Sequence, residues 1–168
     1  VKQVIKSFGG AVKAFKEALK YGGVNTIQVA TINNGQMVSG RNVLITGGGS
    51  GIGLEIAKKC VNEGATVIIA GRNADKLADA VQVIGSDRIK YCVWDITDVN
   101  SYSEKIAECE SLLSGKVDML VNCAGVQPLE FFPNVSETEW ERIYNTNSKA
   151  TFFLSEAFCK KWMEQKDI

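Results

Sequence analysis

The stretch that decides the fold is Thr46-Gly47-Gly48-Gly49-Ser50-Gly51-Ile52-Gly53. It follows the apolar run 42–45 and opens a helical pattern that continues to about residue 63. A buried strand that turns sharply into a helix leaves backbone N–H groups and the positive end of the helix dipole facing outward, which suits a pyrophosphate. The glycine spacing is G-x-x-x-G-x-G rather than G-x-G-x-x-G. Nucleotide binding is the first hypothesis, and a plain glycine-rich turn is the alternative.

The sequence on either side of this stretch alternates between apolar strand patterns and amphipathic helix patterns. The predicted strands are 42–46, 66–70, 89–94 and 117–122, and the predicted helices are 51–63, 74–84, 99–113 and a long tract that begins at Ser136. The first two strands are continuous apolar runs, as in a parallel sheet covered on both faces. Even alternation of this kind predicts right-handed crossovers and an α/β fold with a doubly wound parallel sheet of at least four strands.

Composition excludes several classes of protein. The 168 residues are 45% apolar, and the 19 basic residues balance the 19 acidic ones, so the overall charge does not favour nucleic acid or a membrane surface as a partner. The five cysteines include no C-x-x-C pair and the chain contains no histidine, which argues against a disulfide scaffold, a zinc site or any other metal site. No secretory or membrane-spanning segment is evident, and we expect a cytoplasmic protein with reduced cysteines.

Residues 1–40 form a predicted extension ahead of a nucleotide-binding domain at 41–168. Apolar residues recur at helical spacing over residues 2–20, with lysines opposite, and a short β segment is expected at 26–32. Residues 1–41 hold six basic side chains and one acidic side chain, a net charge of +5. Such a helix binds anionic lipid or, as we favour, packs its apolar stripe on the main domain or on a partner subunit.

In a doubly wound sheet, ligands bind beyond the carboxyl ends of the strands. The segments at these ends are short and polar or rich in glycine, as a groove lined by backbone requires. They are Thr46–Gly53, Gly71-Arg72, Asp95-Ile96 and Asn122–Gly125.

Taken together, these residues resemble the short-chain dehydrogenase/reductase family over about residues 40–165. The resemblance is carried by the Thr46–Gly53 loop, Asp95, the motif Asn122-Cys123-Ala124-Gly125 and Asn147. The third motif is usually Asn-Asn-Ala-Gly, so Cys123 is a departure. The resemblance implies a Rossmann-type fold and an NAD(P)-dependent oxidoreductase that transfers hydride between the cofactor and a carbonyl or alcohol substrate.

The resemblance also implies roles for individual residues. The glycine loop would hold the pyrophosphate and ribose, Asp95 would accept a hydrogen bond from the adenine amino group, and Asn122 and Gly125 would shape the groove. Asn147 is the predicted catalytic residue, because in the family this asparagine helps to hold a water in the proton relay. The predicted cofactor-binding residues are Thr46, Gly47, Gly49, Ser50, Gly51, Ile52, Gly53, Arg72, Asp95, Ile96, Asn122, Ala124 and Gly125.

The end of the second strand favours NADP over NAD. An acidic side chain at that point would bind the free ribose 2′-OH, whereas a guanidinium pairs with a 2′-phosphate. The sequence has Gly71 followed by Arg72 there.

The family's acid/base pair, Tyr-x-x-x-Lys, and its substrate-orienting serine are not found in these 168 residues. Tyr21, Tyr91, Tyr102 and Tyr144 are each followed by a residue other than lysine at i+4. We therefore expect the N-terminal, cofactor-binding part of a longer reductase, truncated before a fifth strand and inactive alone. The alternatives are a non-catalytic dinucleotide-binding or assembly module and a chain completed by a partner. The family's habit of pairing through the long helix near 137–164 suggests a homo-oligomer.

Overall fold

The computed structural model describes residues 35–128 and 131–165. The chain divides into two units, Val1–Ile32 and Asn33–Ile168, and all the described residues belong to the second. The helix expected at 2–20 and the β segment expected at 26–32 lie outside the described residues.

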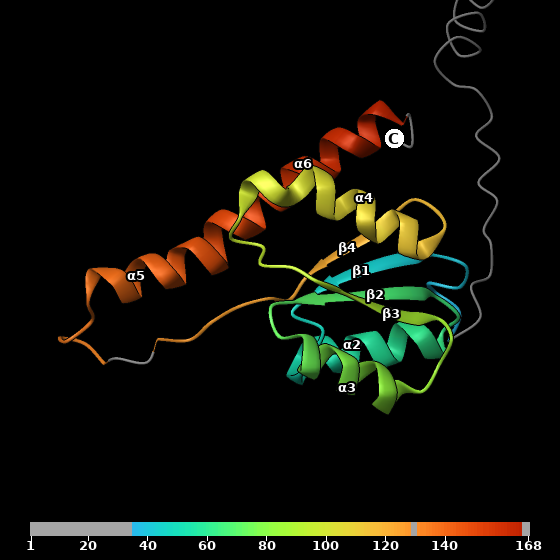
Figure 1. Ribbon diagram of the computed structural model, residues 1–168, viewed down its shortest axis with the longest axis horizontal. Coiled ribbons are helices and arrows are strands. Elements are labelled where there is room, and N and C mark those ends of the chain that lie inside the picture. The colour runs from blue at the N-terminus through green and yellow to red at the C-terminus, as the bar shows by residue number, and fades with distance from the viewer. Residues whose placement is uncertain (1–34, 129–130, 166–168) are drawn as a thin grey trace, which may run out of the picture. The chain divides into compact units, whose positions relative to one another are not determined.

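The centre of the second unit is a parallel sheet (Figure 1). Its strand order is β3-β2-β1-β4, as expected when a doubly wound chain starts in the middle and winds outward both ways. In register, Leu44 lies between Ile68 and Leu120. The strands are β1 (Asn42–Thr46), β2 (Thr66–Gly71), β3 (Ile89–Val93) and β4 (Met119–Asn122). The predicted fold class is confirmed.

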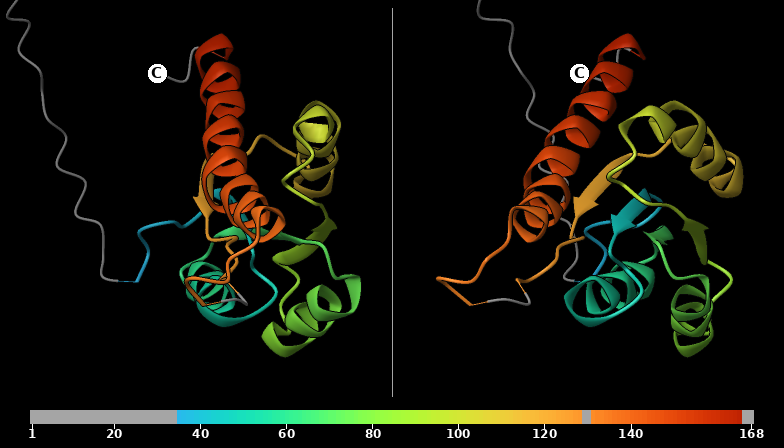
Figure 2. Two further views of the ribbon diagram at one scale, coloured as in Figure 1. Left: turned by 90° about the vertical axis from the view of Figure 1, so that its left-hand side faces the viewer. Right: turned by 60° about the vertical axis from the view of Figure 1, so that its left-hand side comes forward.

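Helices cover both faces of this sheet (Figures 1 and 2). On one face lie α2 (Gly51–Asn62) and α3 (Ala74–Ile84), and on the other lie α4 (Tyr102–Leu113) and α6 (Thr151–Glu164). A short 3₁₀ turn, η1 (Val99–Ser101), precedes α4. Glycine ends α3, since Gly85 adopts φ +62° and its N–H donates to the Val81 carbonyl.

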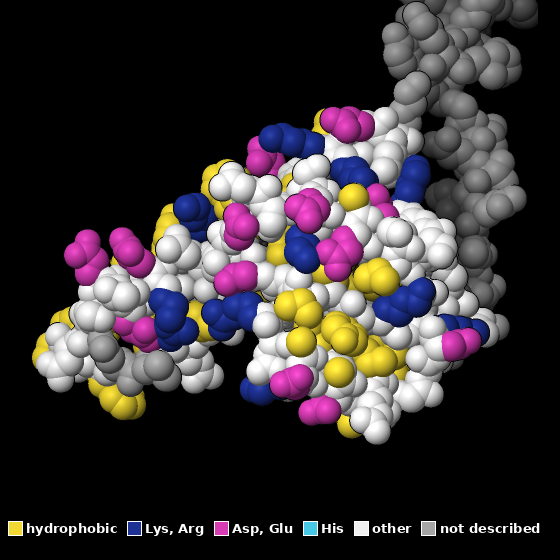
Figure 3. Space-filling model, viewed as in Figure 1, with side chains coloured by type: hydrophobic (Ala, Val, Ile, Leu, Met, Phe, Trp, Pro, Cys, Tyr) yellow, Lys and Arg dark blue, Asp and Glu magenta, His cyan; other side chains and the backbone are white. Residues whose placement is uncertain are grey.

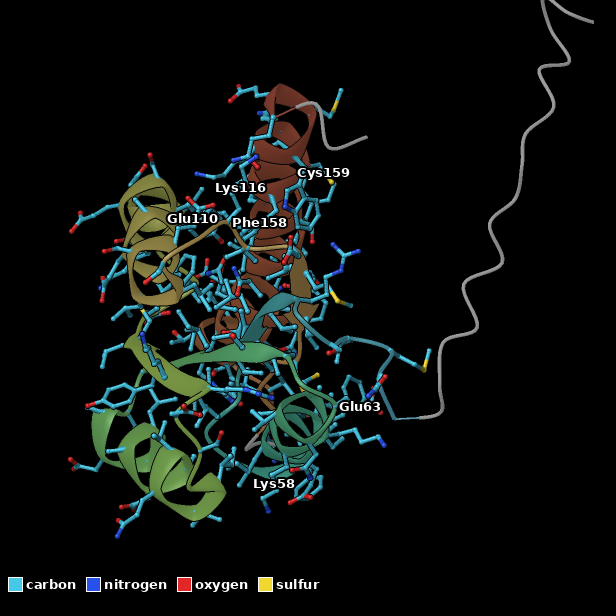
Figure 4. All side chains as sticks on the ribbon, turned by 90° about the vertical axis from the view of Figure 1, so that its right-hand side faces the viewer. Lys58, Glu63, Glu110, Lys116, Phe158 and Cys159 are labelled. Atoms are coloured by element: carbon cyan, nitrogen blue, oxygen red, sulfur yellow. The ribbon has the colours of Figure 1, made fainter. Side chains whose placement is uncertain are left out.

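Successive residues of the central strands enter different cores. Val43 and Ile45 pack toward α2 and α3, whereas Leu44 packs toward α4 and α6, and all three are fully buried. Because both faces need apolar contacts, the strand reads as an unbroken apolar run rather than an alternation. On the second face, Phe158 of α6 is fully buried between the helix and the sheet (Figure 4), and Lys161 of α6 pairs with Glu110 of α4 at 2.8 Å.

The strand β4 is much less covered than its neighbour. Met119 is 38% exposed, while Val43, its register partner on β1, is fully buried. Within the described residues no strand pairs with the far edge of β4. The open edge of an apolar strand is a place where a further strand can pair.

The predicted long helix after Ser136 forms, but it changes pitch in the middle. It consists of α5 (Glu137–Tyr144), a π-helical segment η2 (Asn145–Ala150) and α6. Figure 1 shows that α5 extends past the sheet, so that of this long helix only the α6 part lies over the sheet. Short π segments within helices are often found at functional sites, and this one carries Asn147.

Candidate functional site

A groove of about 520 Å³ opens at the carboxyl ends of the strands. This volume is within the range of small-molecule and cofactor sites. All four strand-end segments predicted from the sequence contribute to it. The lining residues are Gly47, Ser50, Gly51, Ile52, Gly53, Ala70, Gly71, Arg72, Trp94, Asp95, Ile96, Cys123, Ala124, Gly125, Val126, Gln127 and Thr146.

The glycine loop is held tightly against its neighbours. The Gly47 N–H donates to the Ala70 carbonyl at 2.7 Å, and Gly47 adopts φ +70°, a left-handed conformation that favours glycine. A Cβ on Gly53 would stand 2.4 Å from the Gly47 carbonyl oxygen. Side chains at either position would therefore force the turn away from the strand ends. The glycines keep the helix N-terminus close to the sheet.

The first turn of α2 is arranged to receive an anion. Gly51, its first residue, lines the groove and adopts φ +53°, and a Cβ placed there would meet no atom within 4 Å apart from its neighbours in the helix. The first turn contains no acidic residue, and the N-cap residue Ser50 makes no side-chain cap bond. The first N–H groups of a helix have no acceptor within it, and the helix dipole adds positive potential at that end.

Three predicted binding residues lie behind the groove wall rather than in it. Thr46 is 1% exposed, and its Oγ1 accepts hydrogen bonds from the Cys123 and Ala124 N–H groups, both at 3.2 Å. Gly49 faces Leu77, since a Cβ there would be 3.3 Å from the leucine Cδ2. Asn122 donates from Nδ2 to the Ser155 Oγ on α6 at 3.0 Å. None of the three is among the residues that line the groove.

One end of the groove is built from the segment after β3. The Asp95 Oδ1 accepts from the Thr97 N–H at 3.0 Å and from its hydroxyl at 2.8 Å. This Asx turn fixes the carboxylate. Both of these bonds use Oδ1, and among the described residues Oδ2 accepts no hydrogen bond. Ile96 also lines the groove, and Trp94, which the sequence reasoning missed, lines it from an almost fully buried position.

Arg72 lies at the groove where β2 ends, and its side chain is exposed. In the part of the chain that the structure describes, no carboxylate is recorded within ion-pair distance of its guanidinium. Beside it, a Cβ on Gly71 would be 3.6 Å from the Leu77 Cδ2, an ordinary contact. A side chain at residue 71 is therefore sterically possible, so lack of space does not explain why no acidic residue stands there.

The far wall of the groove is joined to the π segment by one side chain. The Asn147 Nδ2 donates to the Val126 carbonyl at 2.9 Å, and the Val126 N–H donates to the Asn147 Oδ1 at 2.8 Å. This two-point contact imitates a strand pairing and holds the chain that leaves β4. Asn147 itself does not line the groove, although its neighbour Thr146 does.

No tyrosine in the described residues is placed to act as an acid or base in this groove. The Tyr102 side chain does not line the groove but is buried in the core beneath α4 and α6, and burial raises the pKa of its hydroxyl to about 12. Tyr144 and Tyr91 do not line the groove. Among the described residues, the groove lining thus includes no tyrosine and no lysine.

Five further residues line the groove that the sequence did not assign to the site, namely Ala70, Cys123, Val126, Gln127 and Thr146. Val126 and Gln127 follow the exit of β4 and Thr146 lies in η2, and the sequence pattern predicts neither the path of that exit nor the π segment. The described residues hold no cluster of three potential metal ligands. They also include no helix long and apolar enough to cross a membrane.

Known proteins resemble this chain over the same region. The family model described as short chain dehydrogenase matches residues 41–167. Gluconate 5-dehydrogenase of Gluconobacter oxydans (strain 621H) is 36% identical over 128 residues, which cover 73% of this chain and 48% of that protein. An uncharacterized oxidoreductase of Staphylococcus aureus (strain MRSA252) is 32% identical over 122 residues, which cover 73% of this chain and 52% of that protein. The chain spans about half the length of these curated relatives.

Solved structures resemble the chain over a similar share of its length. A short-chain type dehydrogenase/reductase from Mycobacterium ulcerans has 34% sequence identity and a TM-score of 0.63, over 70% of this chain and 45% of that one. A short chain dehydrogenase from Bacillus anthracis str. 'Ames Ancestor' has 29% identity and a TM-score of 0.65, over 74% of this chain and 51% of that one.

Proposed function

Because the chain belongs to the short-chain dehydrogenase/reductase family of oxidoreductases, we propose that it is the cofactor-binding part of an NADP(H)-dependent enzyme acting on a carbonyl or alcohol substrate. The observation that carries the proposal is the groove at the strand ends. The N-terminus of α2, which has no acidic residue in its first turn, and the Asp95 carboxylate, which is held by Thr97, both line it. The cofactor supplies the hydride chemistry when bound. The chain supplies the cradle for it.

Each part of the groove then has its own task. The N–H groups of the first turn of α2, with Ser50, Gly51 and Ile52 around them, would hold the pyrophosphate. Asp95 Oδ2 would accept from the adenine amino group, because Oδ1 is already engaged by Thr97. Asn147 would keep Val126, and with it the groove wall, in position. In the family this asparagine also helps to hold a water in the proton relay, and we propose the same role here.

We propose NADP rather than NAD as the cofactor. Arg72 is exposed at the groove with no recorded carboxylate partner in the described residues, so its guanidinium is available for a 2′-phosphate. No acidic side chain stands at residue 71 to bind a free ribose hydroxyl.

The test is a comparison of NADPH and NADH binding by the intact protein and by two arginine variants. We expect Arg72→Ala to weaken NADPH binding by about tenfold or more, the value of a charged hydrogen bond, and to leave NADH binding almost unchanged. Arg88→Ala is the matched control, because Arg88 precedes β3 and so lies at the opposite end of the sheet. Equal losses for both cofactors in Arg72→Ala would contradict the assignment.

We also propose that residues 41–168 form the dinucleotide-binding domain, that residues 1–40 are an extension, and that the catalytic Ser and Tyr-x-x-x-Lys lie outside these residues. The 168 residues alone should then bind NADPH without oxidising it in the presence of ketones. Turnover would require a different proton donor.

A homo-oligomer in the cytoplasm is the proposed setting. Large apolar side chains are exposed near α5, including Phe131 at 88%, Phe132 at 92% and Trp140 at 64%, and Figure 3 shows apolar side chains at that end of the described unit. Exposed patches of this kind commonly mark subunit interfaces. All five cysteines are free thiols, as expected in a reducing compartment.

A further inference from the structure

Tyr102 is a buried polar residue to which neither the family motifs nor the groove assign a role. It is the first residue of α4, 5% exposed, within the apolar core on the α6 side of the sheet. A buried tyrosine hydroxyl normally finds a hydrogen-bond partner. This hydroxyl reaches two.

The two partners belong to different parts of the site. The Tyr102 hydroxyl oxygen is 2.7 Å from the Ile96 carbonyl oxygen and 3.1 Å from the Ala150 carbonyl oxygen. A neutral phenol has a single proton to donate, so the two carbonyls share it, and the nearer one receives the larger part. If the Ile96 carbonyl moves, the bond to Ala150 changes as well.

Tyr102 also supports the groove segment through its ring. The ring stands edge-on to that of Trp94, with centroids 5.7 Å apart and an interplanar angle of 81°. The Trp94 Nε1–H donates to the Ser101 Oγ at 3.2 Å, directly beside Tyr102 in the chain. Trp94 and Ile96 flank Asp95, so the ring and the hydroxyl of Tyr102 hold the carboxylate's segment from both ends.

The other acceptor, the Ala150 carbonyl, belongs to the π segment. Ala150 is the last residue of η2, which also carries Thr146 in the groove wall and Asn147, the residue that clamps Val126. Two elements far apart in the sequence, the Trp94–Ile96 segment and η2, are thus joined through one hydroxyl group.

We infer that Tyr102 is a positioning residue that couples the adenosine end of the groove to the wall held by Asn147. The coupling rests on the proposed function, since it requires a ligand at Asp95. A ligand that tightens the Trp94–Ile96 segment redistributes the shared proton, and the change is passed to Ala150, to η2 and then to Val126. Tyr102 touches neither the ligand nor the reacting atoms.

The experiment uses the intact protein and adenosine 2′,5′-bisphosphate, a ligand without the nicotinamide half. Tyr102→Phe keeps the ring and removes the hydroxyl. Ile106→Val is the matched control, because Ile106 lies one turn further along the same face of α4, is 4% exposed and has no polar group. Binding is measured by calorimetry, and amide hydrogen exchange at Val126 is followed with and without ligand.

In the unsubstituted protein and in Ile106→Val, the ligand should slow exchange at Val126. In Tyr102→Phe, affinity should fall about fivefold, the low end of the coupling expected between two linked sites, and the ligand's effect at Val126 should disappear. The inference is overturned if Tyr102→Phe binds within twofold of the unsubstituted protein, if the effect at Val126 persists, or if Ile106→Val loses as much affinity. Absence of binding by the unsubstituted protein would overturn the proposed function itself, a distinct result.

Discussion

The replacement Thr46→Val tests how the exit of β4 is attached to the centre of the sheet. Thr46 ends β1, and its hydroxyl oxygen accepts hydrogen bonds from the N–H groups of Cys123 and Ala124, each at 3.2 Å. Its contact with the Val121 carbonyl is longer, 3.4 Å, so the group acts mainly as an acceptor. Valine has nearly the same shape but offers no acceptor.

The cost follows from these two contacts. A buried N–H group that loses its partner costs about 1–3 kcal/mol, and the lower figure applies here because Cys123 and Ala124 are only partly buried. Two such groups lower the free energy of unfolding by about 2 kcal/mol, roughly a 30-fold change in the ratio of folded to unfolded protein. NADPH affinity should fall too, since these residues line the groove.

Thr46→Ser is the matched control, because it keeps the acceptor and removes one buried methyl group. It should cost about 1 kcal/mol of stability and leave NADPH affinity within about twofold. Urea unfolding followed by tryptophan fluorescence measures the first quantity and NADPH titration the second. The reasoning is refuted if Thr46→Val unfolds within about 0.5 kcal/mol of the unsubstituted protein, or if Thr46→Ser is the less stable of the two.

Three further predictions concern the loop, the clamp and the buried tyrosine. Gly53→Ala should cost about 3 kcal/mol in urea unfolding because its Cβ would stand 2.4 Å from a backbone oxygen, whereas Gly51→Ala, at φ +53° with open space around it, should cost about 1 kcal/mol; equal costs would contradict this. Asn147→Ala should speed amide exchange at Val126 by removing the acceptor of its N–H, and unchanged exchange would rule the clamp out. Burial, and then the charges of nearby aspartates, raise the pKa of Tyr102 to about 12 in the folded protein, so its hydroxyl ionises first in the unfolded state. The contribution of this hydroxyl to the free energy of unfolding should therefore be fully present below about pH 10 and be lost as the pH rises toward 12. Urea unfolding at several pH values should show this dependence in the unsubstituted protein and not in Tyr102→Phe.

Local sequence signals predicted the elements well where local forces dominate. The sequence predicts Asn73 as a helix N-cap and two capping boxes, Ser136 with Glu139 and Ser101 with Glu104. Asn73 caps α3, accepting from the Lys76 N–H at 2.9 Å, and Ser136 caps α5 by accepting from the Glu139 N–H at 3.2 Å. The capping box predicted for Ser101 is wrong. Ser101 has a helical backbone and makes no side-chain cap bond. Its hydroxyl instead donates to the Asp98 carbonyl and accepts from Trp94, because a tertiary partner is present.

The same division holds for the site. The strand ends could be identified from the sequence. A buried strand requires a continuous run of apolar residues, and the tight turn after it requires glycine, so both leave a local signal. The orientation of a side chain at a strand end could not. Asn122 points to Ser155 rather than into the groove, and Gly48 is required because a Cβ there would stand 2.4 Å from a carbon of Ile69. Both facts depend on residues far away in the chain.

The sequence by itself determined a parallel sheet with helices on both faces and a polar, glycine-rich rim at one end of it, since these follow from periodicity and local conformational preference. Only the tertiary structure decided which rim residues face the groove, where the long helix changes to π pitch, and that one tyrosine hydroxyl joins the Ile96 and Ala150 carbonyls. The reason is physical. Helices and strands are encoded by near neighbours in the chain, whereas a hydrogen bond between residues 48 positions apart forms only after the elements have packed.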